Sequence, residues 1–166
     1  VERIGEAWMR GEIQVFEEHL YTEQMQALLR QAIGALPPGS GRPRILLTTV
    51  PEEQHILGIL MSEALLTLEG AGCVSLGTQT PLADIGLAAQ AQQADIVALS
   101  FSSAFPTRQV APLLKQLRGM LAANIEVWAG GAGIERVAAP EGVRIMGSLG
   151  AALEGLAQWR AAHPAH

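Results

Sequence analysis

The stretch RILLTTVPEEQHILGILMSEALL, residues 44 to 66, sets the fold class of this chain. It opens with a short apolar run, passes through the polar segment PEEQH, and closes with an apolar segment long enough for a helix. The opening run predicts a buried strand over 44 to 50, and the closing segment predicts a helix over about 55 to 70. The same alternation of strand and helix patterns continues toward the C-terminus.

Five strand patterns with intervening helices predict an α/β fold, a doubly wound parallel sheet covered on both faces. For five strands the common flavodoxin-like, Rossmann-like order is 2-1-3-4-5, which brings the loops after strands 1, 3 and 4 together at the ligand-binding carboxyl edge. Those loops read PEEQHILG, SFSSAFPT and GGAG. The other strands are predicted at 73–77, 95–101, 125–129 and 143–147, and the other helices at 82–93, 107–123, 133–138 and 149–162.

The segment PPGSGRPR at 37 to 44 divides the chain, because its prolines and glycines end a helix and favour a linker. We expect a partial helical bundle over 1–36, a linker over 37–43 and the α/β domain over 44–166. Two helices are predicted before the linker, at 2–19 and 22–36. Such a pair buries little apolar surface alone, so we expect it to dock on the α/β domain, on a second chain or on preceding helices. The second helix carries one apolar stripe: Met25, Leu28, Leu29, Ile33 and Leu36.

The composition is that of a soluble globular protein, with 49% hydrophobic residues and a mean hydropathy of +0.23 over 166 residues. No apolar run is long enough to cross a bilayer and no signal peptide is visible, so a cytoplasmic protein without a membrane partner is expected. The single cysteine, Cys73, excludes an internal disulfide. A net charge of −5 predicts that any DNA contact is made by a separate N-terminal domain, absent from this chain. Because the sequence opens on Val, we expect a fragment or a processed product.

The loop after the first strand presents His55, with Glu53 two residues earlier. Imidazole is a common metal ligand, and its second ring nitrogen is usually held by a carboxylate, a role that suits Glu53. A single loop histidine is by itself a weak signal, and taken alone it is better explained as an exposed polar residue near a helix start. The serines of SFSSAFPT and the glycines of GGAG likewise suit either ligand contact or ordinary turn chemistry. No Gly-x-Gly-x-x-Gly follows the first strand and no Walker lysine is present, so a nucleotide phosphate site is not supported.

The spacing of these residues resembles the signature of cobalamin-binding domains, Asp-x-His-x-x-Gly followed at similar distances by Ser-x-Leu and Gly-Gly. The resemblance covers residues 43 to 162, with Glu53 in place of Asp and Ser102 in place of Leu. The matching pattern here is Glu53-x-His55-x-x-Gly58, then 41 residues, Ser100-x-Ser102, then 27 residues, and Gly130-Gly131.

The resemblance implies that His55 is the lower axial ligand of cobalt, displacing the dimethylbenzimidazole of the cofactor. The nucleotide tail would then run along a groove in the α/β domain. Glu53 would support His55 with an arm one methylene longer than the usual Asp. The remaining residues would surround the tail: Gly58 leaves room for it, Ser100 and Ser102 contact it, and Gly130 and Gly131 line its far wall.

The N-terminal segment WMRGEIQVFEEH adds a second motif, Trp8-x9-Glu18-His19. On a continuous helix Trp8, Val15 and His19 would share one face. The motif resembles the Trp-x9-Glu-His motif of CarH/LitR-type, MerR-family light-responsive regulators, in which a helical bundle covers adenosylcobalamin. The likeness implies that Trp8, Val15, Glu18 and His19 surround the 5′-deoxyadenosyl group. It also exposes a departure, since Met9 stands where CarH-like photoreceptors carry the histidine that takes the upper cobalt position after illumination.

The leading hypothesis is therefore a non-enzymatic, cobalamin-binding sensor domain of a transcriptional regulator, responsive to light through adenosylcobalamin. Methylcobalamin or hydroxocobalamin are alternative forms of the cofactor, and self-association through the helical region is expected. The alternative is a corrinoid methyl carrier of a methyltransferase system, although a methyl carrier has no adenosyl group for the Trp-x9-Glu-His motif to recognise. A receiver-type domain is disfavoured because Thr48, Thr49 and Val50 replace the acidic residues expected after its first strand.

Overall fold

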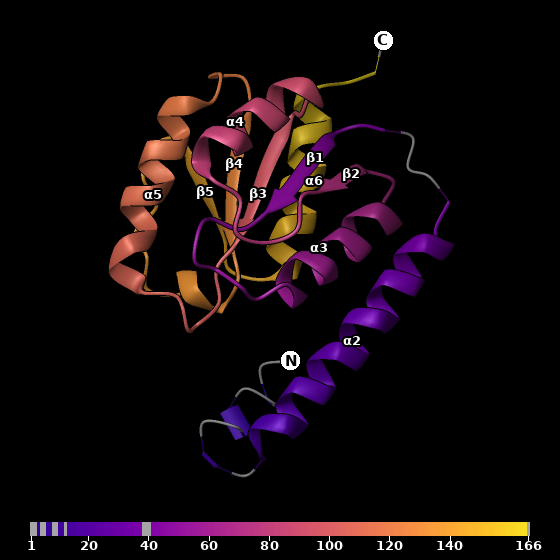
Figure 1. The fold of residues 1–166 in the computed structure, drawn as a ribbon. Coiled ribbons are helices and arrows are strands. Elements are labelled where there is room, and N and C mark those ends of the chain that lie inside the picture. The colour runs from indigo at the N-terminus through magenta and orange to yellow at the C-terminus, as the bar shows by residue number, and fades with distance from the viewer. Residues whose placement is uncertain (1–2, 4–5, 8–9, 12, 38–40, 166) are drawn as a thin grey trace.

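The computed structural model describes residues 3, 6–7, 10–11, 13–37 and 41–165, and it contains one parallel sheet flanked by helices (Figure 1). A long helix precedes the sheet, and strands then alternate with helices as predicted. The helices are α2 (Val15–Ala35), α3 (Leu57–Leu68), α4 (Leu82–Ala91), α5 (Thr107–Met120) and α6 (Leu149–Ala162), with a short 3-10 turn η1 (Ala132–Ile134). The strands are β1 (Arg44–Thr48), β2 (Gly72–Ser75), β3 (Ile96–Ser100), β4 (Glu126–Gly130) and β5 (Val143–Met146).

The sheet has the order β2-β1-β3-β4-β5, and every neighbouring pair of strands is parallel. This order confirms the predicted doubly wound, flavodoxin-like topology. The carboxyl ends of β1 and β3 lie side by side, because Thr48 pairs with Leu99 in the register of these two strands. The β1–α3 and β3–α5 loops therefore leave the sheet at the same edge.

Two hydrophobic cores lie on opposite faces of the sheet. One packs α4 and α5 against residues such as Val97 and Leu99, and the other packs α3 and α6 against residues such as Ile96 and Trp128. Successive strand residues point to opposite faces, so a strand buried on both sides must be apolar throughout. This burial on both faces explains why the predicted strands are nearly continuous apolar runs in the sequence.

The N-terminal helices differ from the prediction. A single helix, α2, runs without a break through residues 20 and 21, where the sequence pattern had separated helices 2–19 and 22–36. The chain is not helical at Gly11, Ile13 and Gln14: Gly11 has a φ of 73°, and Gln14 has an extended backbone. Glu17 favours a helix start at this point, because its carboxylate accepts a hydrogen bond from the Gln14 N–H at 2.7 Å.

The break removes the geometric basis for placing Trp8 on one helical face with Val15 and His19. Trp8 and Met9 lie outside the described residues, so the prediction for Trp8 rests on the motif alone.

Helix α2 contacts α3 and extends beyond the α/β domain (Figure 1). None of its residues is fully buried. Met25, Leu29 and Ile33 of the predicted stripe are half-buried, whereas Leu28 is 59% exposed, so the stripe is narrower than expected. Within the described part of the chain, no helix has both the length and the apolar character needed to cross a membrane.

Candidate functional site

The candidate site lies at the carboxyl edge of the sheet, where the β1–α3, β3–α5 and β4–η1 loops meet. Backbone hydrogen bonds join the last two, since the Phe101 N–H donates to the Gly130 carbonyl and the Gly133 N–H donates to the Phe101 carbonyl, both at 2.9 Å. The first loop is joined to the second through Glu53 and Ser102. The prediction that these three loops meet at one edge is confirmed.

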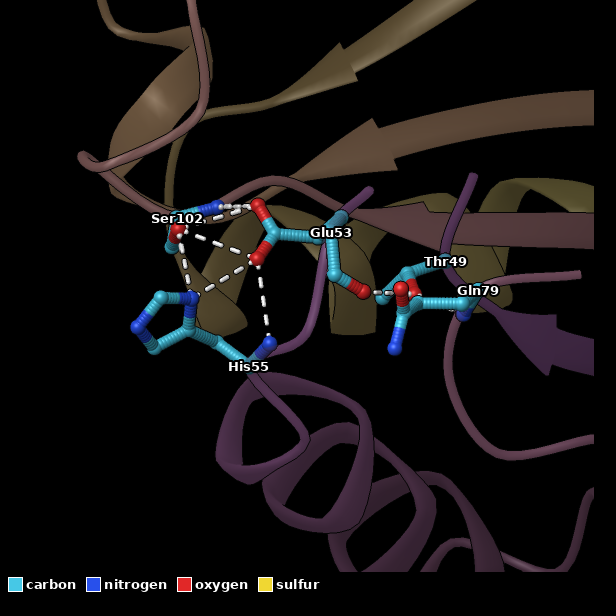
Figure 2. A network of polar contacts seen from close by, with 5 residues as sticks. All are labelled: Thr49, Glu53, His55, Gln79 and Ser102. Carbon is cyan, nitrogen blue, oxygen red and sulfur yellow. Dashed lines mark hydrogen bonds and ion pairs between the residues drawn. The ribbon is translucent and has the colours of Figure 1, made fainter. Parts of the chain in front are cut away.

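Glu53 is a buried carboxylate with hydrogen-bond donors around both of its oxygens, and only 1% of the residue is exposed (Figure 2). Its Oε1 accepts from the backbone N–H of His55 at 3.1 Å and lies 2.8 Å from His55 Nδ1. Its Oε2 accepts from the Ser102 N–H at 2.7 Å and from the Ser102 hydroxyl at 2.9 Å. Such a set of donors compensates the burial of a carboxylate.

These contacts shift the titration of both members of the pair. Burial by itself raises the pKa of Glu53, but the hydrogen bonds from His55 and Ser102 outweigh it, so the pKa lies below its ordinary value. The hydrogen bond to Glu53 raises the pKa of His55, burial opposes this rise, and the negative charges of Glu53 and Glu18 add to it. Glu53 is therefore a carboxylate at neutral pH.

The imidazole of His55 has one nitrogen held by the protein and one directed outward. With Glu53 ionised, the neutral imidazole carries its proton on Nδ1, facing the carboxylate, which leaves the Nε2 lone pair free. Figure 2 shows this second nitrogen pointing away from Glu53 and Ser102, and 60% of the side chain is exposed. His55 thus offers one nitrogen donor, Nε2, to a metal. In the described ranges, His, Cys, Asp and Glu do not gather in a group of three or more that could hold a metal ion.

Ser102 makes contacts that were not predicted for it. The resemblance assigned it to the nucleotide tail, but its hydroxyl is directed to Glu53 and lies 3.1 Å from His55 Nδ1. A leucine at this position would lack that hydroxyl. The longer glutamate and the serine therefore fit each other, a relation that neither residue suggests in the sequence alone.

Sequence reasoning missed the contribution of Thr49. This residue is fully buried, and its hydroxyl donates to the Glu53 carbonyl at 2.7 Å and accepts from the Gln79 N–H at 2.8 Å. The available signal was a pair of threonines, Thr48 and Thr49, at the end of an otherwise apolar strand. Buried hydroxyl groups are hydrogen-bonded in folded proteins, so such a pair predicts polar partners nearby.

The face of the sheet toward α3 and α6 is open near the carboxyl edge. Ala98, Ser100 and Gly130 lie on this face and are half-buried, whereas Val97 and Leu99 on the opposite face of the central strand are closed off. Central strands of a doubly wound sheet are ordinarily covered on both sides. These three half-buried residues form the open stretch of the sheet, beside the loops that carry His55 and Ser102.

The predicted glycines divide into two groups by what a side chain at each would meet. A Cβ at Gly58 would collide with the Ser100 hydroxyl, so this glycine lets α3 approach β3. A Cβ at Gly131 would collide with the Phe101 carbonyl, and φ at Gly131 is 97°, so the fold itself requires glycine there. Gly130 has only ordinary contacts around its Cβ position and lies beside the open stretch.

The described residues of the Trp-x9-Glu-His motif lie in the first turns of α2. Val15 is 56% exposed and His19 is exposed, whereas Glu18 is half-buried and accepts a hydrogen bond from the Thr22 hydroxyl at 3.1 Å. Glu18 is close enough to His55 to contribute to the rise in its pKa. The contact of α2 with α3 places it beside the helix that begins two residues after His55.

Solved structures with this fold include proteins that hold corrinoids. The chain superimposes on a cobalamin-binding protein from Desulfitobacterium hafniense with a TM-score of 0.59 and 21% identity, covering 95% of this chain and 77% of that one. It superimposes on the monomethylamine corrinoid protein of Methanosarcina barkeri with a TM-score of 0.69 and 18% identity, again covering 95% and 77% of the two chains. At these identities the likeness establishes the shared fold.

Sequence comparison shows a relationship beyond the shared fold. Over most of its length the chain is homologous to helix-turn-helix-type transcriptional repressors. They are CarH and CarA of Myxococcus xanthus. The chain is 33% identical to CarH over 129 residues, covering 78% of this chain and 43% of CarH. It is 34% identical to CarA over 140 residues, covering 84% of this chain and 46% of CarA. The chain thus spans less than half the length of either repressor, and no protein-family model matches it.

Proposed function

We propose that this chain is the cobalamin-binding sensor domain of a transcriptional regulator and that it binds adenosylcobalamin with His55 on cobalt. The observation that carries the proposal is the geometry of His55, whose Nδ1 is held by the buried Glu53 carboxylate while the other nitrogen faces outward. This arrangement is what a ligating histidine requires, because the second hydrogen bond fixes both the tautomer and the ring orientation. Homology to CarH and CarA supports the regulatory role.

The donor set fits a corrinoid better than a free metal ion. His55 supplies a single nitrogen, and a metal held by one protein ligand needs its other ligands from elsewhere. A corrinoid would bring most of the cobalt ligands with it, so the single nitrogen of His55 would be enough to attach it to the protein. The open stretch beside Ala98, Ser100 and Gly130 offers a place for the displaced nucleotide tail.

The residues of the chain would divide the work of holding the cofactor. His55 would bind cobalt, Glu53 and Ser102 would orient His55, and Gly58 allows α3 to lie close to Ser100. Bound adenosylcobalamin supplies a cobalt–carbon bond that light can break. No residue of this chain is proposed to be catalytic.

The start of α2 is proposed to cover the upper face of the cofactor. Glu18 and His19 lie in its first turns, and the motif assigns Trp8 and Val15 to the wall around the adenosyl group. Met9 replaces the histidine of the motif's usual photoproduct, and a thioether is a poor substitute for imidazole on oxidised cobalt. His19 would be the imidazole that this part of the chain could offer to cobalt in place of that histidine.

The proposed output is a change in how α2 docks, which alters self-association of the protein. DNA would be contacted through a separate domain outside this chain. The exposed apolar residues of α2 support this output, since Phe16 is 68% exposed and Leu20 is 56% exposed.

The direct test is a titration with adenosylcobalamin in the dark, followed by visible spectroscopy and then illumination. The wild-type protein should show a base-off, His-on spectrum, and His55→Ala should lose it. His163→Ala is the matched control, since His163 stacks on Trp159 at the C-terminal end of α6, with ring centroids 4.2 Å apart. A His55→Ala protein with an unchanged spectrum would refute the axial-ligand assignment, and a wild-type protein that binds no cobalamin would refute the function.

A methyl carrier is the second candidate, and it is favoured by the structural likeness to the monomethylamine corrinoid protein. The same titration separates the two candidates. Tighter binding of adenosylcobalamin together with a light-dependent spectrum supports the sensor, whereas clear preference for methylcobalamin without a light response supports the carrier.

A further inference from the structure

We propose that Thr49 is a positioning residue, which acts through the backbone of Glu53 to aim the Glu53 carboxylate at His55. The proposal rests on the proposed function, because His55 matters as the cobalt ligand. Figure 2 shows the connection: hydrogen bonds join Gln79 to Thr49, Thr49 to the Glu53 carbonyl, and the Glu53 carboxylate to His55. Glu53 itself links the two halves covalently.

The turn that carries Glu53 is strained. The Glu53 N–H donates to the Val50 carbonyl at 3.1 Å, which closes a four-residue turn with Pro51 and Glu52 at its centre. Proline at the first central position suits such a turn, but Glu52 at the second has a φ of 73°, where a type II turn normally carries glycine or asparagine. A non-glycine residue in this conformation is strained, and it persists only where its surroundings hold it.

Thr49 supplies the contact that holds the turn. Its hydroxyl hydrogen is donated to the Glu53 carbonyl at 2.7 Å, and its oxygen accepts from the Gln79 N–H at 2.8 Å. One orientation of the hydroxyl satisfies both bonds, and the residue has no exposed surface. Fixing the Glu53 carbonyl fixes the backbone from which the carboxylate projects and to which the Gln54–His55 segment is attached.

The consequence is that the β2–α4 loop is hydrogen-bonded, through Thr49, to the residue that orients His55. No residue of this loop was predicted to belong to the site. The Thr49 hydroxyl bonds to Glu53 and Gln79 and not to His55, so its effect on His55 must be transmitted by the orientation of Glu53.

The test compares Thr49→Val with Thr48→Val, a matched pair of nearly isosteric changes at adjacent residues that are both fully buried. The Thr48 hydroxyl lies 2.9 Å from the Gly77 carbonyl and 2.7 Å from the Thr80 hydroxyl, and it makes no bond to Glu53. Thr49→Val should weaken adenosylcobalamin binding by about 10-fold, the usual order for a residue that supports a metal ligand. Thr48→Val should lower stability comparably and keep the affinity, and Thr49→Ser should restore the wild-type behaviour.

A second readout uses the cofactor-free protein and so separates this proposal from the proposed function. Ring ¹⁵N NMR of His55 should show the Nδ1–H tautomer in the wild-type protein and in Thr48→Val, and a mixture of tautomers in Thr49→Val. If the wild-type protein binds no cobalamin but this difference appears, the function fails and the role of Thr49 stands.

Both valine variants are also made in a Glu52→Gly background, because glycine adopts the turn without strain and keeps the comparison available if Thr49→Val alone does not fold. In that background Thr49→Val should again have the lower affinity and the more mixed tautomers, and its difference from Thr48→Val should be smaller. Equal affinity and identical tautomers for the Thr49→Val and Thr48→Val proteins would overturn the proposal.

Discussion

At the scale of single residues, the pairing of Glu53 with Ser102 is the most specific feature of the site. Ser102→Ala removes the hydroxyl that donates to Glu53 Oε2 at 2.9 Å but keeps the backbone N–H that donates at 2.7 Å. We expect adenosylcobalamin affinity to fall by about 10-fold, because residues that hold a metal-bound histidine in place contribute on this scale. The spectrum should show that His55 has left cobalt in part of the protein. Isothermal titration and the visible spectrum measure the effect.

The control for this change is Ser103→Ala, because Ser103 is the exposed neighbour of Ser102 in the same loop. Equal affinities for the two variants would show that the Ser102 hydroxyl does not support His55.

The pH dependence of binding also belongs to this scale. Ligation needs an unprotonated Nε2, and Glu53 raises the pKa of His55, so protons compete with cobalt from a higher pH than for a free histidine. The logarithm of affinity should be flat above that pKa and fall by about one unit per pH unit below it. Glu53→Gln removes the carboxylate that raises the pKa of His55. The pH at which the affinity of this variant begins to fall should therefore be lower than in the wild-type protein. A break at the same pH in both proteins would contradict this assignment.

The stability of the cofactor-free protein should depend on the same group in the opposite sense. A raised pKa in the folded state means that protonated His55 adds stability, which is fully present below the ordinary value of about 6.5 and is lost as pH rises through the folded-state pKa. Urea unfolding over this pH range, with His55→Gln as the reference, measures the contribution.

At the scale of elements, the open stretch of β3 is the feature that separates the two faces of the sheet. Ala98→Leu should fill this stretch and weaken binding of adenosylcobalamin strongly, while binding of adenosylcobinamide, which lacks the nucleotide tail, should change little. Ala98 lies between Leu47 on β1 and Trp128 on β4, and both of these neighbours are 2% exposed. A larger side chain cannot be accommodated toward either neighbour, so it would occupy the open stretch.

Binding constants for both corrinoids with the wild-type and Ala98→Leu proteins give the answer. An equal loss of the two ligands would mean that the substitution distorts His55, and unchanged binding of both would place the tail elsewhere.

At the scale of the whole molecule, α2 stands apart from the two cores of the α/β domain. It has no fully buried residue and leaves Phe16, Leu20 and Leu28 largely exposed. If α2 mediates self-association, Phe16→Ser together with Leu20→Ser should shift the protein toward the monomer in size-exclusion chromatography with adenosylcobalamin in the dark. Leu87→Ser is the control, since Leu87 is 64% exposed on α4. A double variant that elutes like the wild type would exclude this surface as the interface.

The sheet, its strand order and the meeting of three loops at its carboxyl edge were all predictable from the amino-acid pattern. The predicted strands match β1 to β5 within two residues at each end, because strands buried on both faces must be apolar throughout and are bounded by polar loops. His55 and Glu53 were also identifiable, since their spacing and their position after the first strand place an imidazole and a carboxylate in one loop. The N-terminal helices were not, because the helical periodicity of 2–19 conceals the non-helical residues Gly11, Ile13 and Gln14.

Tertiary structure alone decided how the site is held together. Ser102 lies 49 residues from Glu53 and Gln79 lies 30 residues from Thr49, so no local pattern records these contacts. The same holds for the half-open face at Ala98, which looks like any buried strand residue until α3 and α6 are in place. The physical reason is that apolar periodicity reports which face of an element is buried, whereas hydrogen bonds between distant loops depend on distances that only the folded sheet sets.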